Sequence, residues 1–197
     1  MTISWDELAE KIALHGEWLA NLGSAGQQLS LAETDLTGVK LAGADLTEAL
    51  LPGARFDGAD LRGCDFARAN LTGAMFAGAD LSQANLTKAE CDRADFRGAR
   101  MYKARGFRAS FAGADFRHAD LAEGNLFKAI LDRARFEDAN LEGVNLEKAW
   151  LQGVRMAGTR LRGAQGVRAA LTQSIDTGEG VLEGEAAMEW LARAAGE

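Results

Sequence analysis

Large apolar residues return at every fifth position over most of the chain. Between Leu36 and Leu161 there are 26 such positions, here named position i, and 25 of them hold Leu, Phe, Met or Cys. Five residues of α-helix turn through about 500° and so leave their starting face, and five residues of strand end on the opposite face. The period therefore predicts a short extended piece followed by a turn in every repeat.

The residues between the large apolar ones are also patterned. Position i−2 shares the face of position i in an extended piece, and it is alanine in 19 of the 26 repeats, which suits the inside of a narrow coil. Position i−1 is Asp or Asn in 13 repeats, residues whose side chains bind nearby backbone in turns. Glycine is frequent at i+2, where a turn tolerates it best. Continuous self-similarity of this kind predicts a solenoid.

Phenylalanine adds a longer period of 20 residues, at Phe56, Phe76, Phe96, Phe116 and Phe136. Four repeats per coil would stack these rings in one internal ladder. Six to seven coils, about 4.8 Å apart, would then form a rod roughly 30 Å long. One repeat breaks the pattern because Gly106 occupies position i. Either a small void remains there, or Phe107 turns inward to fill it.

The segments ADLRG, ANLTG, ADFRG and ANLEG share the motif A-(D/N)-(L/F)-x-x, which resembles the pentapeptide-repeat proteins. The resemblance implies an all-β solenoid, a right-handed quadrilateral β-helix with positions i and i−2 inside. It implies no particular chemistry, because a fold does not carry a function. It extends to the quinolone-resistance branch of the family, whose members are acidic dimeric rods that mimic DNA and bind type II topoisomerase.

Both ends depart from the repeat, so we expect an N-terminal helical cap over 1–28, the β-helix over 29–172 and a separate C-terminal segment over 173–197. Ser4–Glu7 fits a capping box, which opens one helix or two short helices divided at Gly16. The residues with helical spacing behind it are Trp5, Leu8, Ile12, His15, Leu19 and Leu22. A second helix is expected from about 183 to 195. It would cover the last coil, form a homodimer contact, or do both; the dimer contact would use Met188, Trp190 and Leu191.

The net charge of −7 is concentrated in the two ends, because residues 29–172 sum to +1. Within this central region, a period of 20 aligns six basic residues at position i+2 of one face. They are Arg68, Lys88, Arg108, Lys128, Lys148 and Arg168. Large apolar residues beside this column are expected to point outward, where monomers seldom group them. They are Phe107, Phe127, Ile130 and Trp150.

Three interpretations fit this face. Repeat duplication would explain the basic column as a solvated edge. A protein-binding patch would use Phe107, Phe127, Ile130 and Trp150 as its centre and Arg108, Lys128 and Lys148 as its rim, the composition of interface hot spots. A nucleic-acid site would also use stacked aromatic and basic residues, but the negative net charge argues against it.

The chemistry of the remaining residues predicts no catalytic site, metal or cofactor. The chain has two histidines, His15 and His118, and no HExxH, GxSxG or P-loop motif. Cys64 and Cys91 occupy inward positions without metal-site spacing, and we expect reduced core thiols rather than a disulfide. No run of 18 apolar residues and no secretory leader are found, which predicts a cytoplasmic protein without membrane contact.

Two functions therefore remain. The first is a non-catalytic interaction module that binds an unidentified protein partner through the aromatic and basic residues. The second, implied by the resemblance, is a DNA-mimicking protein that binds DNA gyrase or another topoisomerase. The central charge of +1 and the absence of a large projecting loop rank the second behind the first.

Overall fold

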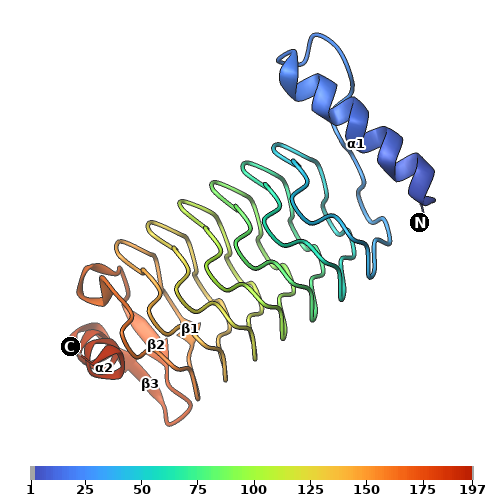
Figure 1. Ribbon diagram of the computed structural model, residues 1–197. Coiled ribbons are helices and arrows are strands. Elements are labelled where there is room, and N and C mark those ends of the chain that lie inside the picture. Colours follow the sequence, from blue (N-terminus) through green and yellow to red (C-terminus); the bar gives the residue numbers. More distant parts are fainter. Residues whose placement is uncertain (1–2, 197) are drawn as a thin grey trace.

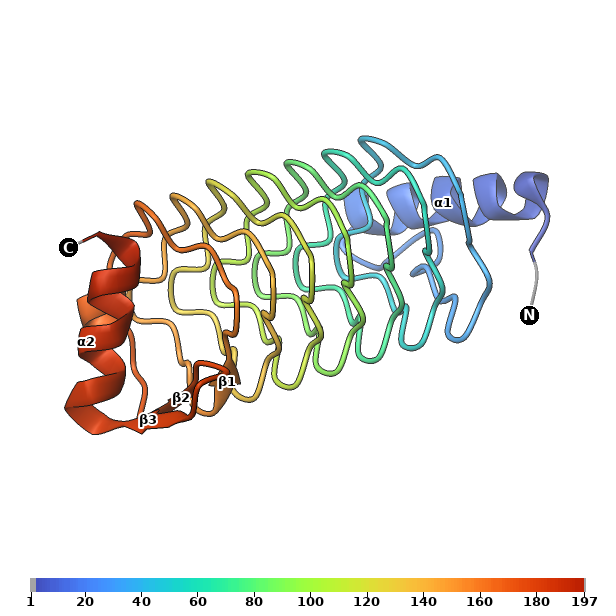
Figure 2. The same cartoon turned by 90° about the horizontal axis from the view of Figure 1, so that it is seen from below.

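The computed structural model describes residues 3–196 as a rod of stacked coils with a helix at each end (Figure 1). Helix α1 (Trp5–Ala20) lies at one end and helix α2 (Gly184–Ala195) at the other. The coils follow one another at a regular spacing between them (Figure 2). The 3-10 helix η1 (Val167–Ala169) and three short strands lie at the α2 end. These strands are β1 (Val154–Arg155), β2 (Ser174–Asp176) and β3 (Val181–Glu183).

Each coil contains four repeats, because parallel bridges join position i−1 of a repeat to the residue 20 positions later. The bridges begin at Ser30↔Leu50 and keep this spacing as far as Asn145↔Gln165. The extended part of a repeat is so short that most coils pair through single residues. Within residues 3–196, continuous strands occur only in the sheet β1-β2-β3, where β2 is parallel to β1 and antiparallel to β3. The chain is therefore a repeat solenoid.

Asp and Asn at position i−1 hold the turns as expected. In all 13 cases the side-chain Oδ1 accepts a hydrogen bond from the backbone N–H two residues later. Met75, Ser110 and Trp150 stand at i−1 and make no such bond. There the same N–H donates to an aspartate of the preceding coil, for example from Gln152 to Asp132 at 3.1 Å.

The five phenylalanines spaced by 20 form the predicted internal ladder. Neighbouring rings are stacked with centroids 4.9–5.1 Å apart. Phe66 and Phe111 meet the ladder edge-on. All seven rings are fully buried, so the ladder forms the centre of the hydrophobic core.

The irregular repeat at Gly106 leaves a small void instead of drawing Phe107 inward. The cavity has a volume of about 10 Å³ and is lined by Gly106, Leu86, Leu126 and Phe111 among others. This space holds at most about one water molecule, far less than a phenyl ring. Phe107 stays in the outer turn, which decides between the two alternatives left open by the sequence.

Helix α1 is a single helix that Gly16 does not divide. Its N-terminus is capped by Ser4, whose Oγ accepts a hydrogen bond from the N–H of Glu7 at 3.2 Å. The predicted apolar stripe is only partly correct. Leu8 and His15 are buried, but Trp5 is 58% exposed and Leu22 is 96% exposed. Leu22 lies beyond the end of α1, where φ is +51° and helical spacing no longer applies.

His15 ties α1 to the first coil. Its Nδ1 accepts a hydrogen bond from the N–H of Leu29 at 3.0 Å, its ring stacks on Trp18, and its buried Nε2 has no partner within the described residues. Burial lowers the pKa of His15, against the opposing effects of the Thr47 backbone and the Asp45 and Glu48 carboxylates. The neutral imidazole is therefore the form that fits this contact.

We expect the free energy of unfolding to fall as the pH drops below about 6.5, the ordinary pKa of histidine. The unfolded chain takes up the proton at that pH while the folded chain still resists it, so protonation favours unfolding. Urea denaturation between pH 7 and pH 5.5 measures this effect against His15→Asn, whose Oδ1 can replace Nδ1 as the acceptor. Equal pH dependence in both proteins would refute the assignment to His15.

The two cysteines are unbonded and fully buried. The Cys64 thiol donates to the carbonyl of Leu41 at 2.9 Å, and burial raises its pKa to about 11. Burial also raises the pKa of Cys91. Because the thiolate is the reactive form, both should react with a thiol reagent only as the protein unfolds. An Arg100→Cys variant supplies an exposed thiol as control, and rapid labelling of the native wild type would contradict this prediction.

Helix α2 begins one residue later than expected and lies against the last coils. Ala187, Leu191, Ala192 and Ala195 are buried, whereas Met188 and Trp190 are partly exposed. Leu191 is 0% exposed and therefore packs within its own chain, which corrects its assignment as a dimer contact. Between residues 3 and 196, neither helix has the length and apolar character that crossing a bilayer requires.

Candidate functional site: an aromatic and basic face

Phe107 and Phe127 lie on the outside of adjacent coils and stack on each other. Their ring centroids are 5.7 Å apart and the ring planes differ by 8°. Arg108 lies over the ring of Phe107 at 5.2 Å. Lys128 and Lys148 lie over the ring of Phe127 at 5.1 and 5.8 Å. Cations over aromatic faces attract the ring electrons, so these side chains form one surface cluster.

Ile130 and Trp150 extend this cluster around the corner of the coil. They are bridge partners in adjacent coils and are 41% and 51% exposed. We name the seven residues of both groups the aromatic–basic face: Phe107, Arg108, Phe127, Lys128, Ile130, Lys148 and Trp150. All seven were selected from the sequence, and the structure brings them together on neighbouring coils.

Leu171 continues the row formed by Ile130 and Trp150, and the sequence pattern missed it. It pairs with Trp150 and is 47% exposed. The two residues are 21 positions apart because η1 accommodates one additional residue, so a strict period of 20 selects Ala170 instead. Gly166 at position i was the one available signal that the repeat changes there.

A groove of about 510 Å³ lies where this row meets α2. Its apolar wall consists of Trp150, Ala170, Leu171 and, from α2, Met188. Its polar residues are Asp132, Gln152, Thr172 and Gln173. The aromatic–basic face therefore ends in a cleft large enough for an apolar side chain.

The basic column occupies backbone positions that favour glycine. Arg68, Lys88, Arg108, Lys128 and Lys148 all have φ between +56° and +59°. The left-handed region costs a non-glycine residue roughly 1–2 kcal/mol. In the corresponding columns of other faces many of these positions are glycine, whereas this column has none from Glu48 to Lys148. The basic side chains are thus kept at a conformational cost.

Few carboxylates neutralise the column. Arg68 pairs with Glu48 at 2.9 Å and Lys148 with Glu147 at 3.7 Å. Lys88, Arg108 and Lys128 form no ion pair within residues 3–196. Arg168, which the period of 20 placed in the same column, is instead part of η1 because of the additional residue. The column therefore ends at Lys148, beside the groove.

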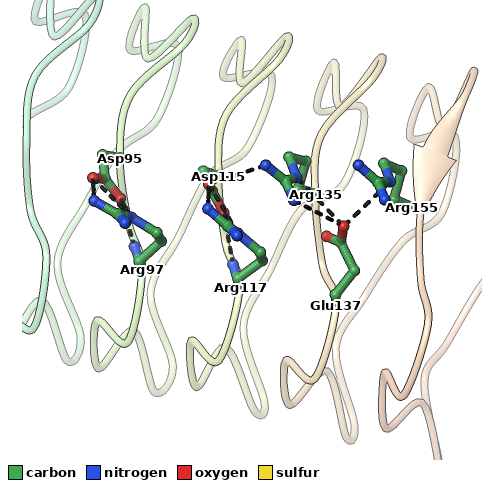
Figure 3. A network of polar contacts seen from close by, with 7 residues as sticks. All are labelled: Asp95, Arg97, Asp115, Arg117, Arg135, Glu137 and Arg155. Carbon is green, nitrogen blue, oxygen red and sulfur yellow. Dashed lines mark hydrogen bonds and ion pairs between the residues drawn. The ribbon is translucent and has the colours of Figure 1, made fainter.

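The next face along the coil has a different charge pattern (Figure 3). Acidic and basic residues alternate there and pair, both within a coil and between coils. Arg117 binds Asp115 at 2.7 Å, and Glu137 Oε1 lies 3.2 Å from both Arg135 and Arg155. Partial burial opposes ionisation of Asp115, but hydrogen bonds from Arg117 and the nearby positive charges lower its pKa. This network stabilises the rod and leaves little unpaired charge for a ligand.

The described residues contain no group of three or more His, Cys, Asp or Glu that could hold a metal ion. The two histidines lie far apart in the chain: His15 is buried between α1 and the first coil, and His118 is exposed beside Asp138. The arrangement of the aromatic–basic face suits contact with another molecule, since its aromatic, aliphatic and cationic groups can all be desolvated by a partner.

Comparison with known proteins agrees with this architecture. The family model for pentapeptide repeats matches the chain in 8 copies, over residues 30–66, 64–101, 109–147, 129–165 and 139–175. No curated protein matches the chain.

Among solved structures, a trypsin-treated variant of QnrB1, a plasmid-mediated fluoroquinolone resistance protein, is 22% identical, with a TM-score of 0.60. The match covers 74% of this chain and 78% of that chain. HetL, a pentapeptide repeat protein involved in heterocyst differentiation regulation from the cyanobacterium Nostoc sp. strain PCC 7120, is 23% identical. That match covers 88% of this chain and 96% of HetL, with a TM-score of 0.42. The repeat itself, matched over most of the rod, shows that the chain belongs to the pentapeptide repeat family.

Proposed function

We propose that this protein is a non-catalytic interaction module that binds a protein partner through the aromatic–basic face. The observation that supports it is the surface stack of Phe107 and Phe127 under three cations, next to exposed Ile130 and Trp150. Repeat duplication alone accounts for a basic column, but it does not account for large apolar side chains gathered beside that column in adjacent coils. Tryptophan and arginine in such patches are the residues that most often dominate binding energy.

Affinity capture from a cell lysate tests the proposal with two variants of equal charge change. Phe127→Glu/Trp150→Glu alters the face, and Arg100→Glu alters an exposed ladder half a coil away; each changes the net charge by −2. We expect a protein captured by wild type and by Arg100→Glu to be lost from the double variant. Identical captured proteins for all three would contradict the proposal.

A second candidate is topoisomerase binding, favoured by the shared fold with a fluoroquinolone resistance protein. A DNA gyrase supercoiling assay, titrated with this protein with and without a fluoroquinolone, distinguishes it from the first. Inhibition or drug protection at low micromolar protein would favour this candidate. We expect no effect, because DNA mimicry needs an acidic rod and residues 29–172 sum to +1.

Finer features of the fold also stay proposals. These are right-handed winding, a quadrilateral cross-section, six to seven coils, and a capping role for α1 and α2. Helices at both ends of the rod would cover strand edges that otherwise recruit other chains, which supports the capping role. The domain limits at 28 and 172, a cytoplasmic location and a homodimer through Met188 and Trp190 remain predictions. Sedimentation at high micromolar concentration tests the dimer, and a monomer there would refute it.

A further inference from the structure

We propose that the partner binds with an acidic segment that carries one large apolar side chain. The apolar side chain would enter the groove between Trp150, Leu171 and Met188, and the carboxylates would pair with Lys148, Lys128 and Arg108. This inference rests on the proposed function and specifies the chemistry of the partner.

The groove determines the apolar part of the ligand. Trp150 and Leu171 are about half exposed, at 51% and 47%, and they form its wall together with Met188. The volume of about 510 Å³ suits a large side chain with its flanking backbone. Gln152 and Thr172 at the same groove already hydrogen-bond within the chain, so polar contacts to that backbone would come from the side chain of Gln173.

The basic column determines the charge of the ligand. Lys148 is two residues from Trp150, and Lys128 and Arg108 follow in successive coils, about 4.8 Å apart. The aromatic rings of Phe107 and Phe127 hold these cations without neutralising them, and among the three, Lys148 alone has a carboxylate partner within residues 3–196, Glu147 at 3.7 Å. An extended segment presents side chains on one face about every 7 Å. One anchor and two or three carboxylates therefore span the whole face.

The same observations argue against a nucleic acid as the occupant. A nucleic acid carries a charge on every phosphate and needs a long continuous positive surface, but Glu147 interrupts this one beside Lys148. A nucleic-acid chain also has no aliphatic group for the groove. A second copy of this chain is the competing occupant, because Trp190 of α2 is partly exposed beside Glu189, and the test therefore includes self-association.

The test uses designed peptides and the full-length protein. The probes are two short fluorescent Gly/Ser peptides. Each contains one tryptophan and three glutamates at every second position, and the glutamates follow the tryptophan in one peptide and precede it in the other. Their sister peptides replace all glutamates by glutamine, all glutamates by lysine, or the tryptophan by serine. A deoxythymidine oligonucleotide of similar length serves as the nucleic-acid probe. Fluorescence anisotropy measures binding to wild type, Trp150→Glu, Lys128→Glu/Lys148→Glu and the control Arg100→Glu.

We expect the tryptophan–glutamate peptide to bind wild type and Arg100→Glu at least tenfold more tightly than the glutamine or serine peptides. Trp150→Glu should abolish this binding, and Lys128→Glu/Lys148→Glu should change the preference to the lysine peptide. Equal binding of the glutamate and glutamine peptides would overturn the acidic assignment while leaving a Trp150-dependent face intact. Failure of every peptide, tighter binding of the oligonucleotide, or self-association lost in Trp150→Glu would each overturn the proposal. The affinity capture from a cell lysate tests the proposed function independently of these peptide measurements.

Discussion

Replacing Phe96 by alanine is expected to lower the free energy of unfolding by about 3–5 kcal/mol. Phe96 lies in the middle of the internal ladder, between Phe76 and Phe116 at 5.0 and 4.9 Å, with Phe111 edge-on. Its removal leaves a cavity that neighbouring coils cannot close, because each coil is fixed by hydrogen bonds to the coils on both sides. Urea denaturation followed by circular dichroism measures the loss.

Phe107→Ala is the matched control for this substitution. The same side chain is removed, but Phe107 lies in an outer turn, where it stacks on Phe127 and lies under Arg108. We expect a cost of about 0.5–1.5 kcal/mol, the value of an aromatic pair. Similar losses for the two variants would contradict the internal ladder as the main source of core stability.

Gly166→Ala is expected to have the second large effect, a loss of about 3 kcal/mol or more from a main-chain clash together with an unfavourable φ. Gly166 has φ +70°, and an added Cβ would lie 2.5 Å from Cβ and 2.7 Å from Cα of Glu147 in the preceding coil. Backbone atoms of a paired coil cannot move aside easily. The substitution should therefore displace η1 and with it Leu171, one wall of the groove.

Gly163→Ala isolates the clash from the effect of φ. Gly163 has φ +72°, but the nearest atom to an added Cβ is the backbone nitrogen of Gly143 at 3.9 Å. This variant should lose only about 1 kcal/mol, since lysine and arginine occupy equivalent positions elsewhere in the rod. Thermal denaturation compares the two variants, and we expect a lower midpoint for Gly166→Ala than for Gly163→Ala. Equal midpoints would show that close packing at Gly166 is not needed.

Most of the rod could be predicted from the sequence because its structure is determined within each repeat. Five residues contain all the local signals: the inward positions i and i−2, the Asp or Asn at i−1 and the turn at i+2. Each coil then repeats the same contacts with the next. The phenylalanine ladder followed from the period of 20 alone.

The features that were missed depend on contacts between distant parts of the chain. Strand β2 pairs with β1 on one side and with β3 on the other, and no local sequence period predicts β2 or β3. The additional residue in η1 shifts Leu171 into the exposed row and Arg168 out of the basic column, although both lie in a segment that still resembles the repeat. Trp5 and Leu22 continue a helical stripe in sequence, but both stay more than half exposed in the structure.

The candidate face could largely be predicted because its residues are placed by the repeat itself and not by contacts between distant parts of the chain. Outward positions follow directly from inward ones, so Phe127, Ile130 and Trp150 could be placed on the surface without knowledge of the tertiary structure. The position of Phe107 could not be decided, because a glycine at position i leaves space whose size depends on how the neighbouring side chains relax. They relax almost completely, and the remaining cavity of about 10 Å³ is too small for the ring.

Site-specific photo-crosslinking in the producing cell tests the central claim most directly. A benzoylphenylalanine residue is placed at Phe127, at Trp150 or, as control, at Arg100 on the ladder half a coil away. We predict one crosslinked protein shared by the positions 127 and 150 and absent at 100, because the partner covers both residues of the aromatic–basic face. Crosslinks of equal yield at all three positions, or none at 127 and 150, would contradict a partner-binding role for this face.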